Sequence, residues 1–259
     1  MALSSITKKL IMSISGLFLI VFLLLHMTIN FFSVIDTFTG KYGAADGLFQ
    51  IGCDFMALPI VTIMVPVLAA GFLVHIIYAF ILSYGNYKAR GSQRYAVTVN
   101  EPGVEWASKN MLVLGVIVIL GLGLHLVHFW SKMMRVELMG SEITQIGEEV
   151  VHATDGAAII AFTFSKWYNV VLYIIWLAAL WFHLNHGVWS MFQTAGFAND
   201  KWYPRLKCAS KLVSTLIVLG FAAVIITFFA CHICGGCAEA CCSEAAQACT
   251  EACCAGHAH

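Results

Sequence analysis

The sequence has very little charge for its length. Of its 259 residues only 11% are Asp, Glu, Lys or Arg, whereas 60% are hydrophobic, and the mean hydropathy is +0.84. A soluble domain has about 25% charged residues, so the composition excludes an ordinary soluble fold. The sequence also lacks a glycine-rich dinucleotide fingerprint, a ferredoxin-like cysteine spacing in the loops between its apolar runs, and the Cys-x-x-Cys-His motif. We therefore expect no flavin, no iron–sulfur cluster and no covalent c-type haem on this chain.

Long hydrophobic runs are what the sequence has instead. They cover roughly Leu10–Ile35, Met56–Tyr84, Asn110–Trp130, Trp167–Phe192 and Leu212–Ala230. Each run is about 20 residues or longer, the length that a helix needs to cross a hydrocarbon layer of ~30 Å. The sequence therefore predicts an all-α integral membrane bundle of five transmembrane helices. No small-residue cleavage site follows the first run before Asp36, so we expect it to remain as a helix and not to be removed as a signal peptide.

The distribution of Lys and Arg predicts the orientation, because cytoplasmic flanks carry the excess of these residues. With the N-terminus in the cytoplasm, ten fall on the inner side: Lys8, Lys9, Lys88, Arg90, Arg94, Lys109, Lys201, Arg205, Lys207 and Lys211. Four fall on the outer side: Lys41, Lys132, Arg135 and Lys166. We therefore expect a multi-pass protein of the cytoplasmic membrane, with a transmembrane domain over residues 1–230 and an outward-facing tail over residues 231–259.

Six histidines fall inside the apolar runs. They are His26, His75, His125, His128, His183 and His186. An ionisable side chain inside a membrane is costly and is usually retained for a function, so each of them is a candidate site residue. Two other interpretations are open: single histidines can hydrogen-bond neighbouring helices, and histidines clustered at one depth can bind zinc.

The depths of four histidines bear on this choice. At a helical rise of ~1.5 Å per residue, His26 and His125 each lie about 16 residues from the inner end of their run, and so in the outer half of the membrane. His75 and His183 lie about 18 and about 15 residues from the outer ends of theirs, and so in the inner half. The four thus form two pairs at levels roughly 10–15 Å apart. Two haems, each held by two histidines, fit this pattern, whereas a single metal centre does not.

Haem also agrees with the glycines of the predicted helices. A large flat macrocycle between helices needs small residues at close approaches. Five glycines lie near the histidine levels: Gly16, Gly71, Gly121, Gly123 and Gly187. Iron held by two imidazoles has no open coordination position, which suits electron transfer and not oxygen binding.

Several short motifs follow one another in an order that is typical of a known family. They are Gly16 with His26-Met-Thr-Ile-Asn30, His75-Ile-Ile-Tyr78 with Asn86-Tyr-Lys-Ala-Arg90 and Arg94-Tyr95, His125-Leu-Val-His-Phe-Trp130, and His183-Leu-Asn-His-Gly187 with Phe192-Gln193. At these residues the chain resembles the five-helix, two-haem cytochrome b subunit of the succinate:quinone oxidoreductases, which include succinate dehydrogenases and fumarate reductases. The resemblance spans residues 8 to about 230.

The resemblance implies which histidines bind iron. Spacing alone does not choose within the doublets on the third and fourth helices, because residues three apart share a helical face. The family pattern places the ligands at His125 and His183, with His26 and His125 on the outer haem and His75 and His183 on the inner haem. It leaves His128 and His186 as neighbours of the haems.

The resemblance also implies a complex. In the family, a flavoprotein with FAD interconverts succinate and fumarate, an iron–sulfur subunit docks on the cytoplasmic face, and the membrane subunit exchanges electrons with menaquinone or menaquinol. The basic loops Lys88–Arg94 and Lys201–Lys211 could dock a partner or anionic lipid, or could reflect the positive-inside rule alone. We expect lipid, quinone and these two subunits as partners, and no nucleic acid.

Quinone chemistry needs a proton-exchanging group at the outer membrane edge. Asp54, just before the second helix, is our first candidate, and Asp46 and His152 are weaker ones. Some relatives place a carboxylate two residues before the ligand on the fourth helix, where this chain has Trp181. That departure argues against a proton path through the bundle at this position.

Eight cysteines crowd into the last part of the chain, which the family pattern does not include. They are Cys231, Cys234, Cys237, Cys241, Cys242, Cys249, Cys253 and Cys254. Cys237 and Cys241, like Cys249 and Cys253, are spaced as on one helical face, and an oxidising outer location permits disulfides between such helices. Metal binding by Cys234 and Cys237 with His232, or by His257 and His259, and a disordered tail are the alternatives.

Two other functions remain open for the transmembrane domain. One is a di-haem cytochrome b subunit that serves a different partner, such as a hydrogenase or a formate dehydrogenase. The other is a haem-free proton-coupled transporter that uses the histidines as a relay. The direction of succinate or fumarate turnover is not visible in the sequence.

Overall fold

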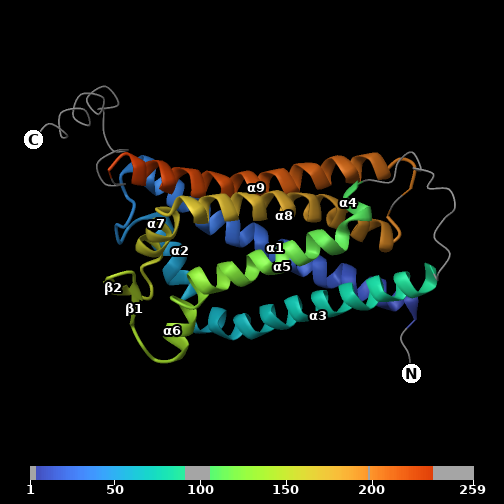
Figure 1. The fold of residues 1–259 in the computed structure, drawn as a ribbon, viewed down its shortest axis with the longest axis horizontal. Coiled ribbons are helices and arrows are strands. Elements are labelled where there is room, and N and C mark those ends of the chain that lie inside the picture. The colour runs from blue at the N-terminus through green and yellow to red at the C-terminus, as the bar shows by residue number, and fades with distance from the viewer. Residues whose placement is uncertain (1–3, 91–105, 198, 236–259) are drawn as a thin grey trace, which may run out of the picture. The chain divides into compact units, whose positions relative to one another are not determined.

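The computed structural model describes residues 4–90, 106–197 and 199–235, and over this range it is an all-α protein with one small β-hairpin. The long helices are α1 (Ser5–Thr39), α3 (Pro59–Arg90), α5 (Met111–His125), α8 (Trp167–Thr194) and α9 (Tyr203–Ile233). A π-helical turn, η1 (Leu126–Trp130), continues α5 directly. Five segments are long and apolar enough to cross a membrane, as the sequence predicts (Figure 1).

The predicted boundaries are less accurate than the number of helices. The first helix begins at Ser5 and ends at Thr39, and the fifth begins at Tyr203, so both extend beyond their apolar runs into polar sequence. The second predicted span was wrong at its start. Met56 belongs to a separate short helix, and α3 begins only at Pro59, which suits a first helical position because proline has no backbone N–H to leave unpaired.

Short elements fill the connections. They are α2 (Leu48–Met56), α4 (Trp106–Lys109), α6 (Met134–Leu138), β1 (Ile143–Ile146), β2 (Glu149–His152) and α7 (Gly156–Phe164). β1 and β2 pair antiparallel, with Ile143 opposite His152 and Ile146 opposite Glu149. The turn between them contains Gly147 at φ 63°, a left-handed conformation that glycine adopts without steric cost.

The described chain divides into two compact units, each of which takes a part of the long helices. The first unit consists of Met1–Leu24, Ile63–Leu120 and Ala178–Val218. Its core contains a cluster of Ala107, Leu114 and Ala179, with Ile117 packed against them. The second unit consists of Leu25–Thr62, Gly121–Leu177 and Leu219–His259, and it contains α2, η1, α6, the hairpin and α7.

A buried carboxylate organises the connection after α1 in the second unit. Asp36 is only 1% exposed, and its side chain accepts hydrogen bonds from the backbone N–H groups of Leu48 (3.0 Å) and Phe49 (2.6 Å). These are the first residues of α2, whose N–H groups have no partner within the helix. The chain thus returns to the end of α1 at the start of α2. Within the connection between the two helices, the Tyr42 hydroxyl donates to the Ala157 carbonyl. Asp36 thereby fixes α2 against the end of α1.

Candidate functional site

The four histidines selected from the sequence meet two by two. His26 and His125, which we call the outer pair after their predicted depth, lie in the second unit with ring centroids 5.7 Å apart and planes at 85°. His75 and His183, the inner pair, lie in the first unit with centroids 6.3 Å apart and planes at 66°. Each pair joins two helices far apart in the sequence. The fold therefore brings together the same couples that the depth argument predicts.

These separations can be compared with two imidazoles that bind one metal ion from opposite sides. A metal–imidazole bond is about 2.0–2.1 Å long, so the two bonding nitrogens lie about 4 Å apart and the ring centroids roughly 6 Å apart. Both pairs match this value. Among the described residues, no group of three or more His, Cys, Asp and Glu side chains could hold a metal ion together. The two imidazoles of each pair are the residues that could hold a metal or a metal-containing cofactor here.

The inner pair is closely bounded by α1 and α5. The Ser15 hydroxyl lies 3.2 Å from Nδ1 of His75, and a Cβ added at Gly16 would lie 3.4 Å from Cε1 of the same ring. On the other side, a Cβ at Gly115 would lie 3.8 Å from Cε1 of His183. Nδ1 of His183 is buried, and no hydrogen-bond partner is found for it in the described chain. Nδ1 of His186 is buried in the same way, so this feature does not separate His183 from the other histidine of its doublet.

The outer pair is surrounded by aromatic rings. Phe221 of α9 lies 5.7 Å from His26, while Phe129 and Trp176 lie 5.1 Å and 5.9 Å from His125, all measured between ring centroids. A Cβ at Gly121 would lie only 2.0 Å from Cδ1 of Trp176, so the indole occupies the space that any larger residue would need. Apolar rings of this kind exclude water and lower the local dielectric constant, which in haem proteins influences the reduction potential.

The helix changes its winding directly after His125. The backbone N–H of Ser131 donates to the carbonyl of Leu126 at 2.8 Å, a bond five residues long that marks η1 as a π-helical turn. Such turns are rare, and they are found mostly at functional sites. His125 is the last residue of regular α5, so this turn changes the direction of the residues that follow a candidate iron ligand.

His128 and His186 do not belong to either pair. Nδ1 of His128 lies 3.2 Å from the hydroxyl of Tyr173, and the two rings stack with centroids 5.8 Å apart. His186 makes an edge contact with Trp189 at 5.1 Å. Each one therefore has an aromatic neighbour, and the role beside the ligands that the resemblance implies stays a prediction.

The three residues proposed for quinone chemistry lie in different surroundings. Asp54 is exposed on α2 and accepts a hydrogen bond from the Gln50 amide at 2.9 Å. Asp46 pairs with Lys41 at 2.8 Å on the surface, and this ion pair lowers the pKa of Asp46 and raises that of Lys41. His152 lies at the end of β2 and is the only one of the three that lines the pocket described next.

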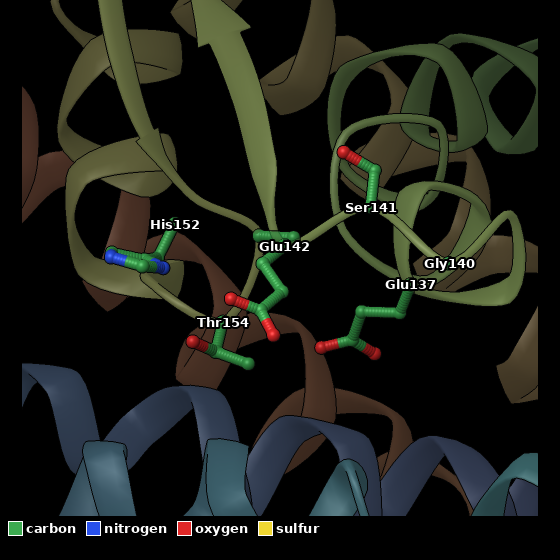
Figure 2. A pocket seen from close by; sticks show the side chains of 7 residues that line it. Glu137, Gly140, Ser141, Glu142, His152 and Thr154 are labelled. Atoms are coloured by element: carbon green, nitrogen blue, oxygen red, sulfur yellow. The ribbon is translucent and has the colours of Figure 1, made fainter.

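A polar pocket of about 410 Å³ lies between α6 and the β-hairpin of the second unit. Its lining residues are Glu137, Gly140, Ser141, Glu142, His152, Ala153 and Thr154. The carboxyl groups of Glu137 and Glu142 point toward one another, with the Thr154 side chain beside Glu142 (Figure 2). Burial raises the pKa of Glu137 above its ordinary value. The pocket thus combines a proton-accepting carboxyl, an imidazole and hydroxyl groups.

Trp181 forms a specific contact at the position where some relatives of the resembled family have a carboxylate. Its indole N–H donates to the Thr215 hydroxyl of α9 at 3.0 Å. An indole N–H can donate but cannot release a proton in the physiological range. The Trp181 side chain therefore offers no proton-carrying group at this place.

The predicted cytoplasmic loops are described only in part. Arg94 lies outside the described residues, as do the tail cysteines from Cys237 onward. The loop predicted over residues 201–211 was wrong for most of its length, because α9 already begins at Tyr203. The Lys207 ammonium lies in the first turns of α9, over the rings of Trp189 (5.2 Å) and Tyr203 (4.7 Å). Cations over aromatic rings are common near membrane interfaces. Because this contact lies within the chain, it does not test the docking of a partner, which stays a prediction.

Sequence reasoning missed four residues of these sites. Ser15 and Tyr173 contact histidines through the rotation of their helices, and Glu137 and Glu142 are brought together by the hairpin. The spacing of His75 and Ser15 carried no signal, because they lie on different helices. The position of Glu137 could have indicated it. It follows the third apolar run at the predicted outer edge of the membrane, the same edge at which Asp54 was selected before the second run.

The fold and these sites define the class of protein as an all-α, multi-pass membrane protein with paired histidines inside its helices. Comparison of the chain with models of protein families, with curated proteins and with solved structures finds no match.

Proposed function

We propose that this chain is a di-haem cytochrome b subunit that carries electrons across the cytoplasmic membrane between menaquinol or menaquinone and a succinate- or fumarate-active partner. The observation that carries the proposal is the separation within the two histidine pairs, 5.7 Å and 6.3 Å between ring centroids. Two imidazoles that share one iron stand at roughly this distance.

The residues present fit two b haems. His26 with His125 would hold one iron, and His75 with His183 the other. A bound haem would supply a one-electron carrier whose two axial positions are occupied by imidazole, which suits electron transfer. The chain itself would orient the imidazoles, surround them with apolar rings such as Trp176 and Phe221, and keep water away from the iron.

The partner subunits are proposed from the resemblance alone. The chain has no flavin-binding or ferredoxin-like motif of its own, so succinate chemistry would belong to a flavoprotein with FAD, and the electrons would pass through an iron–sulfur subunit. The same histidine pairs could serve a hydrogenase or a formate dehydrogenase. Succinate-dependent reduction of the haems, together with FAD that copurifies with the chain, would separate the first partner from the others.

Quinol oxidation would take place at the predicted outer side. A quinol that gives two electrons to the haems also releases two protons, which need acceptors at the membrane edge. The pocket with Glu137, Glu142 and His152 supplies such acceptors, and we prefer it to Asp54 because several acceptors converge there. Because Trp181 donates its N–H to Thr215, we expect no proton path through this part of the bundle.

The decisive test is haem quantitation on the purified full-length protein. A reduced-minus-oxidised spectrum should show b-type haem, with two haems per chain. His183→Ala should remove one haem and leave the outer one, and His26→Ala should remove the other. His152→Ala, which changes a histidine outside both pairs, should retain both haems. A wild-type protein without bound haem would leave the haem-free transporter as the better interpretation.

A further inference from the structure

The Ser15 hydroxyl on α1 is placed to orient one of the candidate iron ligands. It lies 3.2 Å from Nδ1 of His75, and it also lies 3.0 Å from the Met12 carbonyl one turn back on the same helix. Ser15 is only 8% exposed, so its hydroxyl depends on these partners. Since a carbonyl only accepts, the single hydroxyl proton is donated to Met12. The hydroxyl oxygen then accepts from His75.

With Nδ1 of His75 as the donor, this arrangement fixes the tautomer of the ring. If Nδ1 donates its hydrogen to Ser15, the neutral ring carries no hydrogen on Nε2, and the Nε2 lone pair is available for a metal. The ring is also held from its edge. A Cβ at Gly16 would lie 3.4 Å from Cε1 and 3.8 Å from Nδ1 of His75, so the Nδ1–Cε1 edge faces the backbone of α1.

From these contacts we infer that Ser15 is a positioning residue for the inner haem: its hydroxyl accepts the Nδ1 hydrogen of His75 and presents Nε2 toward His183 and the shared iron. This inference rests on the proposed function. A hydrogen bond at the far nitrogen makes a ligating imidazole more basic, and a more basic ligand favours ferric iron over ferrous iron. Ser15 therefore lowers the reduction potential of the inner haem.

The two ligands of the inner haem differ in this respect. No hydrogen-bond partner is found in the described chain for Nδ1 of His183, whereas Nδ1 of His75 has Ser15. The inner haem thus has one ligand held by a hydrogen bond and one held by packing alone. The Ser15 contact is then the point through which this unit of the chain adjusts the inner haem. The outer pair has a different and longer contact, with Nδ2 of Asn30 3.5 Å from Nδ1 of His26 on the same helix.

The test is a redox titration of the purified wild-type protein and of Ser15→Ala, followed in the haem absorption bands. The spectrum of His183→Ala, which retains the outer haem alone, identifies the outer component. In Ser15→Ala we expect the inner haem to lose up to about tenfold of its preference for the ferric state, an upward shift of up to about 59 mV for one electron. The outer haem should keep its potential.

Two further variants separate the hydroxyl from mere packing. Ser15→Thr retains a hydroxyl and should restore the wild-type potential of the inner haem. Ser13→Ala removes a hydroxyl two residues away on α1 and should change neither haem. Loss of the inner haem in Ser15→Ala, with retention in Ser15→Thr, would support the inference equally.

An unchanged or lowered inner potential in Ser15→Ala, with both haems bound, would overturn the inference and leave the proposed function intact. Loss of the inner haem in both Ser15→Ala and Ser15→Thr would overturn it too, because the hydroxyl would then not be the relevant feature. Absence of haem from the wild-type protein would instead refute the proposed function.

Discussion

Gly121 on α5 makes a contact that no larger residue can share. A Cβ built there would lie 2.0 Å from Cδ1, 2.2 Å from Cγ and 2.3 Å from Nε1 of Trp176. In Gly121→Ala the indole must therefore move by an ångström or more. It is not free to do so, because its ring packs against His125 at 5.9 Å and against Tyr173 at 5.6 Å.

The magnitude follows from two opposed terms. Overpacking of this kind costs about 1–3 kcal/mol, and the contacts of the partly buried indole with His125 and Tyr173 favour the upper part of that range. Alanine in place of glycine inside a helix returns up to about 1 kcal/mol. We expect a net loss of about 1–2 kcal/mol and, because Trp176 contacts His125, a changed spectrum of the outer haem with the inner haem unaffected.

The matched control is Gly85→Ala on α3, where an added Cβ would meet nothing within 4 Å. It should leave stability unchanged or raise it. Thermal unfolding in detergent, followed by haem absorption, compares the two variants. If Gly121→Ala is as stable as Gly85→Ala and its outer haem keeps the wild-type spectrum, then Trp176 does not lie against Gly121 and the packing described for the outer pair is wrong.

Three other perturbations test separate contacts. Burial raises the pKa of Glu137, so the carboxylate form that accepts a proton is lost as the pH falls through this raised value; quinol oxidation should slow there, and Glu137→Gln should remove that dependence while both haems remain. If Asp54→Asn abolishes quinol-driven turnover and Glu137→Gln does not, the pocket is not the quinol site. Asp36→Ala leaves the buried N–H of Phe49 and the partly buried N–H of Leu48 without their acceptor and should cost about 1–3 kcal/mol, measured by thermal unfolding, whereas Asp46→Ala on the surface should have little effect. Trp181→Phe should lower stability by about 0.5–1.5 kcal/mol through loss of the bond to Thr215, and an unchanged unfolding midpoint would argue against that bond.

The transmembrane helices were predictable because the bilayer sets a minimum length for an apolar run. Their ends were not, since a helix continues into polar sequence for as long as its backbone bonds are satisfied. The start of α9 at Tyr203 and the break after Met56 are examples. The hairpin of β1 and β2 was also missed, because its four-residue strands are too short to give a periodic pattern.

The pairing of the histidines could be predicted because depth along a helix depends only on residue number. Contacts such as Ser15 with His75 could not, since they depend on how two helices are rotated against each other. The pocket at Glu137 could not either, because the hairpin that completes it is a tertiary feature. No spacing within the chain encodes which partner the proposed complex would contain.

The π-helical turn at Leu126–Trp130 gives the third span one residue more than a regular ladder would hold. One residue corresponds to about 100° of rotation around a helix axis. Removal of a single residue from this turn would leave His125 facing its partner and would swing everything beyond it, including Glu137, by that angle. The phase of the segment after the turn can thus change without a change in the part of the same helix that carries His125.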